Sequence, residues 1–224
     1  MYDANYVEKI IQYIRENQVS TTEVGDCLDK TGAVIGSHAL NKGLFKVGQV
    51  HYIYAHSNTN WPVHKQLRDV PPDRVVFVDD IEVKDRALFG ELVTMFIMEK
   101  LHSIAIVSKG LMRDAAELIR GEYPIWCGGI TPEGCFNIDR AETPSIRLVA
   151  ENNRAYYHGS IAVCDDCGVV IIPKDKINKE MYEKLIAMEE QEKMWFHCVR
   201  DLDWDTFDTV CLKKYKEVDV TDAK

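Results

Sequence analysis

Two short segments of the sequence carry residues that together could bind a small organic acid. Arg113 is followed directly by Asp114, and Gly90 is followed directly by Glu91 earlier in the chain. A guanidinium offers a rigid fork of donors to a carboxylate, and an aspartate offers the hard oxygen ligand that Mg²⁺ prefers. Taken alone, Arg113-Asp114 is more typical of an ordinary helix start, and the nearby Gly90-Glu91 is what brings the chemical interpretation level with it. A chemical role therefore depends on whether the two segments meet.

The hydrophobic pattern around these segments predicts strands that alternate with helices. Apolar runs over 74–80 and 104–107 indicate buried strands, and a third strand is expected over 123–127. Apolar residues at helical spacing predict helices over 87–100 and 112–120. In open parallel sheets, ligands bind beyond the carboxyl ends of the strands, and helix N-termini present free N–H groups there. We therefore expect both helix starts to face one anion-binding crevice.

The remaining segments complete an α/β chain. An amphipathic helix is expected over 3–17, and a capping box from Ser20 to Glu23 opens a second helix that ends near Gly32. A strand over 47–55 and a short helix from Trp61 follow.

After Gly134 the pattern indicates a meander of short strands followed by a long charged helix. The four strands are expected over 146–150, 154–157, 160–163 and 169–172, and the helix from about 177 to about 197. No repeat or linker divides the chain. The sequence thus predicts one α/β domain with a β-rich second layer and a protruding C-terminal helix.

Composition and charge exclude several classes of protein. Of 224 residues, 46% are hydrophobic and 28% charged, which is typical of a globular domain, and the net charge is −9. An acidic surface repels phosphate backbones, so we expect no nucleic-acid partner. The apolar runs are far shorter than a membrane span, and no export signal is visible. A cytoplasmic protein without a membrane partner is expected.

The cysteine pattern favours reduced thiols. The count of seven is odd, and Cys164 and Cys167 form the one C-x-x-C pair. No second pair at zinc-site spacing accompanies it, so small buried side chains that flank a turn are favoured over a zinc or redox site.

Five segments together resemble the RraA-like family, which includes class II 4-hydroxy-4-methyl-2-oxoglutarate aldolases and the RraA regulators of RNase E. The central segments are Gly90–Val93, Gly110–Asp114 and Tyr123–Pro132, and Ser20–Gly32 and Gly159–Pro173 add to the likeness. The resemblance implies a single β/β/α swivelling domain over residues 1–224, with its core over about 20–195. It also implies a homotrimer or hexamer with active sites at the subunit boundaries.

The resemblance further implies roles for the first helix tip and for Arg113. In the aldolases, the arginine that matches Arg113 holds the carboxylate or keto oxygen of a 2-oxo acid. The loop at Gly90 and the backbone amides that match Leu92 and Val93 assist it. The implied reaction is retro-aldol cleavage of a 4-hydroxy-2-oxo acid to pyruvate, with oxaloacetate decarboxylation as a side activity.

A divalent metal, Mg²⁺ or Mn²⁺, is implied at Asp114. Glu91 would act in catalysis by holding water on the metal, and Glu189 or Glu192 of a neighbouring subunit would complete the surroundings. The sequence also departs from the family pattern: the interval from Glu91 to Arg113 is one residue longer, and Lys109 stands where an acidic or small residue is common. Two alternatives remain open, a non-catalytic ring-shaped regulator and a lyase or isomerase acting on a sugar-derived acid.

Overall fold

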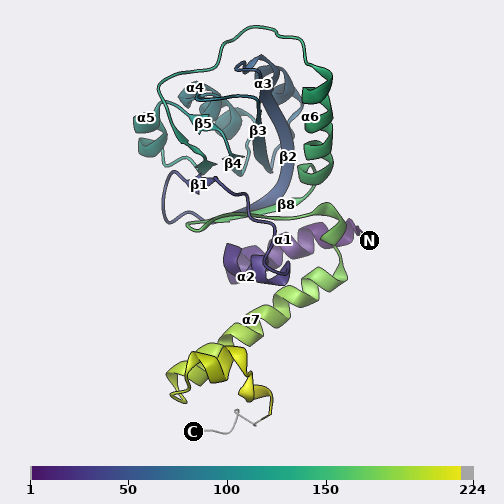
Figure 1. Ribbon diagram of the computed structural model, residues 1–224, viewed down its shortest axis with the longest axis vertical. Coiled ribbons are helices and arrows are strands. Elements are labelled where there is room, and N and C mark those ends of the chain that lie inside the picture. Colours follow the sequence, from purple (N-terminus) through teal and green to yellow (C-terminus); the bar gives the residue numbers. More distant parts are fainter. Residues whose placement is uncertain (1, 218–224) are drawn as a thin grey trace.

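The computed structural model describes residues 2–217, in which one mixed sheet forms the centre of the molecule (Figure 1). Its strand order is β1-β6-β4-β3-β2-β8-β9. Four central strands run parallel, namely β2 (Lys46–His56), β3 (Arg74–Ile81), β4 (Ala105–Ser108) and β6 (Ile125–Cys127). The antiparallel strands are β1 (His38–Ala39), β8 (Ile161–Asp165) and β9 (Gly168–Ile172).

The two edges of this sheet approach each other. Ala33, just before β1, forms an antiparallel bridge with Val170 of β9, so the sheet is nearly closed. A separate pair of short strands, β5 (Leu111–Met112) and β7 (Gly129–Ile130), lies beyond the carboxyl ends of β4 and β6. This mixed α/β arrangement agrees with the swivelling-domain fold expected from the sequence.

Apolar side chains cover both faces of the central strand β3. Val76 and Val78 point to one face and pack with Leu118, whereas Val75 and Phe77 point to the other. Alternation of side chains along a strand produces these two faces. Burial on both sides explains why the strand reads as a continuous apolar run rather than as an alternating pattern.

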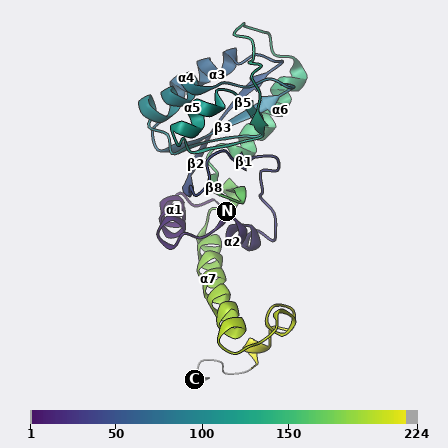
Figure 2. The same ribbon diagram turned by 90° about the vertical axis from the view of Figure 1, so that its left-hand side faces the viewer.

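Helices surround the sheet, and the last long one projects from it (Figures 1 and 2). The capping box predicted at Ser20 is present, since Ser20 and Glu23 exchange hydrogen bonds at the start of α2. Helix α7 begins beside α1 and α2 and extends away from the sheet. The helices are α1 (Asn5–Asn17), α2 (Thr21–Cys27), α3 (Trp61–Gln66), α4 (Glu91–Met95, continued by a π-helix over Phe96–Lys100), α5 (Ala115–Arg120), α6 (Pro144–Tyr157) and α7 (Lys179–Arg200).

The meander expected after Gly134 is wrong in its first half. Residues 146–150 and 154–157 do not form strands but belong to the single helix α6. The Thr143 hydroxyl accepts a hydrogen bond from the Ile146 amide. Pro144 lies in the first turn, where the backbone N–H that proline lacks would have no partner within the helix. The strands β8 and β9 exist as expected, but they extend the main sheet rather than forming a second layer.

Two helices start later than their apolar patterns indicate. The helix expected from residue 87 begins at Glu91, and the helix expected from residue 112 begins at Ala115. Ala87 instead bridges to Leu111 and to Gly134 in extended form. Long-range pairing therefore determines where both helices begin.

Candidate active site

The starts of α4 and α5 lie against each other at the carboxyl edge of the sheet. The Glu91 amide donates a hydrogen bond of 3.0 Å to Oδ2 of Asp114. A Cβ atom on Gly90 would lie only 2.0 Å from the same oxygen and 2.8 Å from Cγ of Arg113. The structure thus brings Gly90, Glu91, Arg113 and Asp114 together, and only glycine fits at position 90.

A short ladder of backbone hydrogen bonds holds the two segments in this position. The Leu88 amide donates to the Leu111 carbonyl at 2.8 Å, and the Arg113 amide donates to the Phe89 carbonyl at 3.1 Å. Leu88 and Met112 are fully buried beneath it. These hydrogen bonds hold the segments before α4 and α5 in extended pairing. Each helix therefore begins only where that pairing ends, and the two helix starts lie side by side.

Asp114 has a left-handed backbone, with φ of 59° and ψ of 39°. It stands at the N-cap position of α5, yet its carboxylate makes no capping hydrogen bond to that helix. A non-glycine residue in this region is uncommon, although aspartate tolerates it better than most. The carboxylate is instead directed to the start of α4, where it accepts the hydrogen bond of the Glu91 amide.

Arg113 places its guanidinium beside Gly134. Its side chain is half exposed, with Nε 3.8 Å from Oδ2 of Asp114, and a Cβ on Gly134 would lie 2.7 Å from Nη1. Arg86 donates a hydrogen bond of 2.9 Å to the Gly134 carbonyl. Sequence reasoning missed Gly134 and Arg86, because an isolated glycine after a turn carries no signal of a side chain packed over it.

The first turn of α4 offers two free backbone donors. The amides of Leu92 and Val93 have no acceptor among residues 2–217, as is usual in the first turn of a helix. The side chain of Val93 is buried, whereas that of Leu92 is 74% exposed. These amides and the Arg113 guanidinium could hold an anion between them.

The carboxylate of Asp114 fits a Mg²⁺ ion. Its side chain is 42% exposed, and within the described part of the chain Oδ1 accepts no hydrogen bond. Mg²⁺ is usually bound through one or two carboxylates, with water and substrate oxygens as the other ligands. No group of three or more His, Cys, Asp or Glu side chains that could hold a metal is found in residues 2–217. The single carboxylate of Asp114 could thus hold such an ion only together with water or substrate oxygens.

Glu189 and Glu192 lie on α7 and do not belong to the site of their own chain. Glu189 accepts a hydrogen bond of 2.5 Å from the Tyr13 hydroxyl and pairs with Lys193 at 2.6 Å. Burial and the neighbouring Glu23 raise the pKa of Glu192. Because α7 points away from α4 and α5 (Figures 1 and 2), a role for either glutamate in a neighbouring subunit stays a prediction.

A second polar cluster lies at the ends of β3 and β4. The buried carboxylate of Asp79 accepts hydrogen bonds from the Tyr52 hydroxyl at 2.8 Å and from Nδ2 of the Asn153 side chain at 2.7 Å. Burial, aided by Asp79, raises the pKa of Asp80 to about 6. Burial lowers the pKa of Lys109, but Tyr157 and the two aspartates outweigh it and raise that pKa overall. Sequence reasoning noted Lys109 only as a departure from the family pattern and did not predict this cluster.

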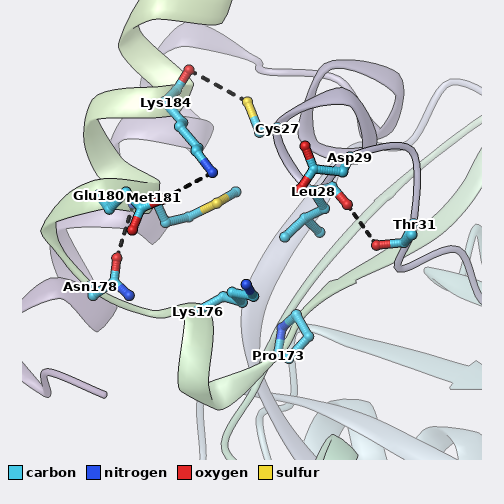
Figure 3. A pocket seen from close by; sticks show the side chains of 10 residues that line it. All are labelled: Cys27, Leu28, Asp29, Thr31, Pro173, Lys176, Asn178, Glu180, Met181 and Lys184. Atoms are coloured by element: carbon cyan, nitrogen blue, oxygen red, sulfur yellow. Dashed lines mark hydrogen bonds and ion pairs between the residues drawn. The ribbon is translucent and has the colours of Figure 1, made fainter. Parts of the chain in front are cut away.

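A cavity of about 230 Å³ between α2 and α7 is separate from the candidate site (Figure 3). The Cys27 thiol donates to the Lys184 carbonyl at 3.5 Å, and Lys184 pairs with Glu180 at 3.0 Å. Burial raises the pKa of Cys27 to about 11, so this thiol stays protonated. Cys164 and Cys167 are free thiols; Cys164 is buried as expected, but the expectation of a buried side chain is wrong for Cys167, which is exposed.

The fold and the site define a class of protein: a nearly closed α/β sheet with an arginine that could bind an anion and an aspartate that could bind a metal ion at its carboxyl edge. The chain belongs to the RraA-like family, since the model of that family, described as Aldolase/RraA, matches residues 21–171. The family includes both metal-dependent aldolases or lyases and RNase E inhibitors. Family membership thus agrees with the resemblance seen in the sequence.

One relative and two solved structures extend the comparison. Protein DlpA of Legionella pneumophila is 24% identical over 188 residues, which cover 78% of this chain but only 29% of DlpA. A Pseudomonas syringae protein superposes with a TM-score of 0.72 at 18% identity, over 92% of this chain and 94% of its own. Streptomyces coelicolor RraAS2, a member of the RNase ES inhibitor RraA family, gives 0.66 at 21% identity, over 87% and 98%. These two structures support the fold alone.

No helix in residues 2–217 is both long enough and apolar enough to cross a bilayer.

Proposed function

We propose that the protein is a divalent-metal-dependent carbon–carbon lyase. It cleaves a 4-hydroxy-2-oxo acid to pyruvate by a retro-aldol reaction and decarboxylates oxaloacetate as a side activity. The observation that carries the proposal is the contact of the Gly90–Glu91 backbone with Arg113 and Asp114. We further propose a cytoplasmic homotrimer or hexamer with its sites at the subunit boundaries.

The anion-binding groups match the charges of such a substrate. The Arg113 guanidinium binds the carboxylate or the keto oxygen, and the free amides of Leu92 and Val93 orient the same end. Cleavage leaves an enolate, whose oxygen gains negative charge, and groups already directed at that oxygen lower the barrier. A Mg²⁺ or Mn²⁺ ion held by Asp114 would supply Lewis-acid stabilisation of the same charge.

Glu91 is our candidate for moving the proton, because it begins α4 directly beside Asp114. Its amide donates a hydrogen bond to Asp114, while its side chain is exposed to solvent. The carboxylate accepts the proton of the substrate's 4-hydroxyl, directly or through a water molecule. The C3–C4 bond then breaks, its electrons form the enolate, C4 becomes a carbonyl carbon, and protonation at C3 gives pyruvate. No lysine Schiff base is required.

Arg113→Ala tests the proposal directly. Pyruvate release from a panel of 4-hydroxy-2-oxo acids and from oxaloacetate is measured with Mg²⁺, with Mn²⁺ and with a chelator. We expect metal-dependent release by the native protein and a loss of about a hundredfold or more in the variant. Arg120→Ala, at an exposed position of α5, is the matched control and should keep full activity. A metal-loaded native protein that is inert toward the whole panel would contradict the proposal.

The net charge of −9 favours a second candidate, a non-catalytic ring that docks onto a basic partner. RraAS2 is described as a member of an RNase inhibitor family. Under this alternative, Arg113→Ala would retain partner binding in full, and the native protein would release no pyruvate.

A further inference from the structure

A groove of about 500 Å³ lies at the opposite edge of the sheet from the candidate active site. It is formed by the end of α1, the start of β2 and the segment that leads into β4. Because β2 and β4 are parallel, their first residues share the amino edge of the sheet, whereas Gly90 and Asp114 follow the carboxyl edge. The volume is typical of a site for a small molecule. The residues that matter are Arg15, Phe45, Lys46, Met98, Ser103 and Ile104.

The groove carries two unpaired positive charges in an acidic protein. Arg15 lies in the last turn of α1 and Lys46 is the first residue of β2. In the described part of the chain, neither forms an ion pair, and no carboxylate is among the lining residues. The electrostatic field of the groove favours an anion.

The walls between these charges are apolar. The Ile104 side chain lies so close over Gly48 that a Cβ there would be 2.5 Å from Cδ1 of Ile104. Phe45 and Met98 add further apolar surface. Ser103 is only 7% exposed, and its hydroxyl has no partner among residues 2–217. A simple inorganic anion would leave these walls unused, so the groove fits an anion that also has a hydrocarbon body.

We propose that this groove is a second binding site, for an organic monocarboxylate with an aliphatic or aromatic body. The carboxylate lies between Arg15 and Lys46, and the body lies along Ile104 and Met98. The proposal is independent of the chemistry at Arg113, because the two sites share no residue and lie at opposite edges of the sheet.

Titration with octanoate, followed by NMR of the methionine methyl groups, tests the proposal. This groove, a second groove and the cavity of Figure 3 are each lined by one methionine, so each methyl signal reports on one place. Met98 reports on this groove, Met95 on the apolar groove between α3 and α4, and Met181 on the cavity of Figure 3. Met→Leu variants assign the signals. We expect a saturable shift of the Met98 methyl on titration with octanoate, with the other two unmoved. A stationary Met98, or a larger shift of Met95 or Met181, would overturn the proposal.

Charge variants separate this site from general apolar binding. Arg15→Gln and Lys46→Gln should each weaken octanoate binding about tenfold, the effect of losing one charge-assisted hydrogen bond. Arg68→Gln, which removes a cation from the groove that contains Met95, should leave it unchanged. Octanol and inorganic phosphate each lack one half of the ligand and should bind at least tenfold more weakly than octanoate. Equal binding of either, or of the Arg15 and Lys46 variants, would refute the assignment.

Discussion

Gly90 leaves no room for a side chain where α4 begins. Gly90→Ala would place a methyl group 2.0 Å from Oδ2 of Asp114 and force the carboxylate and Arg113 apart. We expect the rate of pyruvate release to fall about a hundredfold, since displacing a catalytic group by about 1 Å lowers the rate by about this factor. The fold should persist by circular dichroism. Gly25→Ala is the control: it lies within α2 with its nearest neighbour at 3.9 Å, and should keep activity and gain about 0.5–1 kcal/mol of stability.

Asp80 makes the stability of the protein depend on pH. Burial and Asp79 raise its pKa in the folded state to about 6, above its value in the unfolded chain. Its contribution to stability therefore falls as pH rises from about 4 through about 6. Asp80→Asn should raise the free energy of unfolding by about 1–2 kcal/mol at pH 8, after allowance for solvent screening of this half-buried group, and by less at pH 4.5. Urea denaturation at the two pH values measures this. If the variant instead has a lower free energy of unfolding than the native protein at pH 8, the attraction between Asp80 and Lys109 outweighs the cost of burial.

Which site residues could be predicted from sequence depends on what each one contacts. Arg113 and Asp114 follow an apolar strand in the sequence, so both their chemistry and their position at the carboxyl edge of the sheet could be predicted. Gly134 lies in the long connection after β7, where it packs against Arg113 and accepts a hydrogen bond from Arg86 of the segment between β3 and α4. Nothing in their local pattern indicates that contact.

Among the elements, α6 shows why short apolar runs are ambiguous. Ile146, Ala150 and Tyr157 recur at helical spacing and are the buried residues of the helix, yet each half of the segment also suits a short strand. The Thr143 cap and Pro144 resolve the choice. In contrast, β3, β4 and β9 are buried and continuous, and the sequence predicts them well. The late starts of α4 and α5 could not be predicted, because pairing of Ala87 with Leu111 and Gly134 sets them.

Thr143→Ala tests the importance of that cap. The substitution removes the acceptor for the Ile146 amide and should lower the free energy of unfolding by about 1 kcal/mol. Thr143→Ser retains the hydroxyl and should stay within a few tenths of a kcal/mol of the native protein in urea denaturation. Equal losses in the two variants would show that the methyl group, rather than the cap, matters.

At the scale of the whole molecule, the nearly closed sheet holds the site at one edge while α7 leaves the domain. If a glutamate of α7 completes the site of a neighbour, two inactive chains should complement each other. Arg113→Ala chains mixed with Glu192→Gln chains should regain pyruvate release that neither shows alone, because some boundaries then hold an intact pair. The same experiment with Glu189→Gln chains in place of Glu192→Gln chains shows which of the two glutamates takes part. Glu190→Gln is the control and should release pyruvate at the native rate on its own. Failure of both mixtures would place catalysis within one chain.

The direction of α7 has a practical consequence for any kinetic study. A helix that extends beyond its own domain can reach an active centre only when another chain is present. Turnover per chain would then decline on dilution, once the concentration drops below the dissociation constant of the assembly. An assay run at nanomolar enzyme could therefore record an inert protein where a micromolar one records a working catalyst.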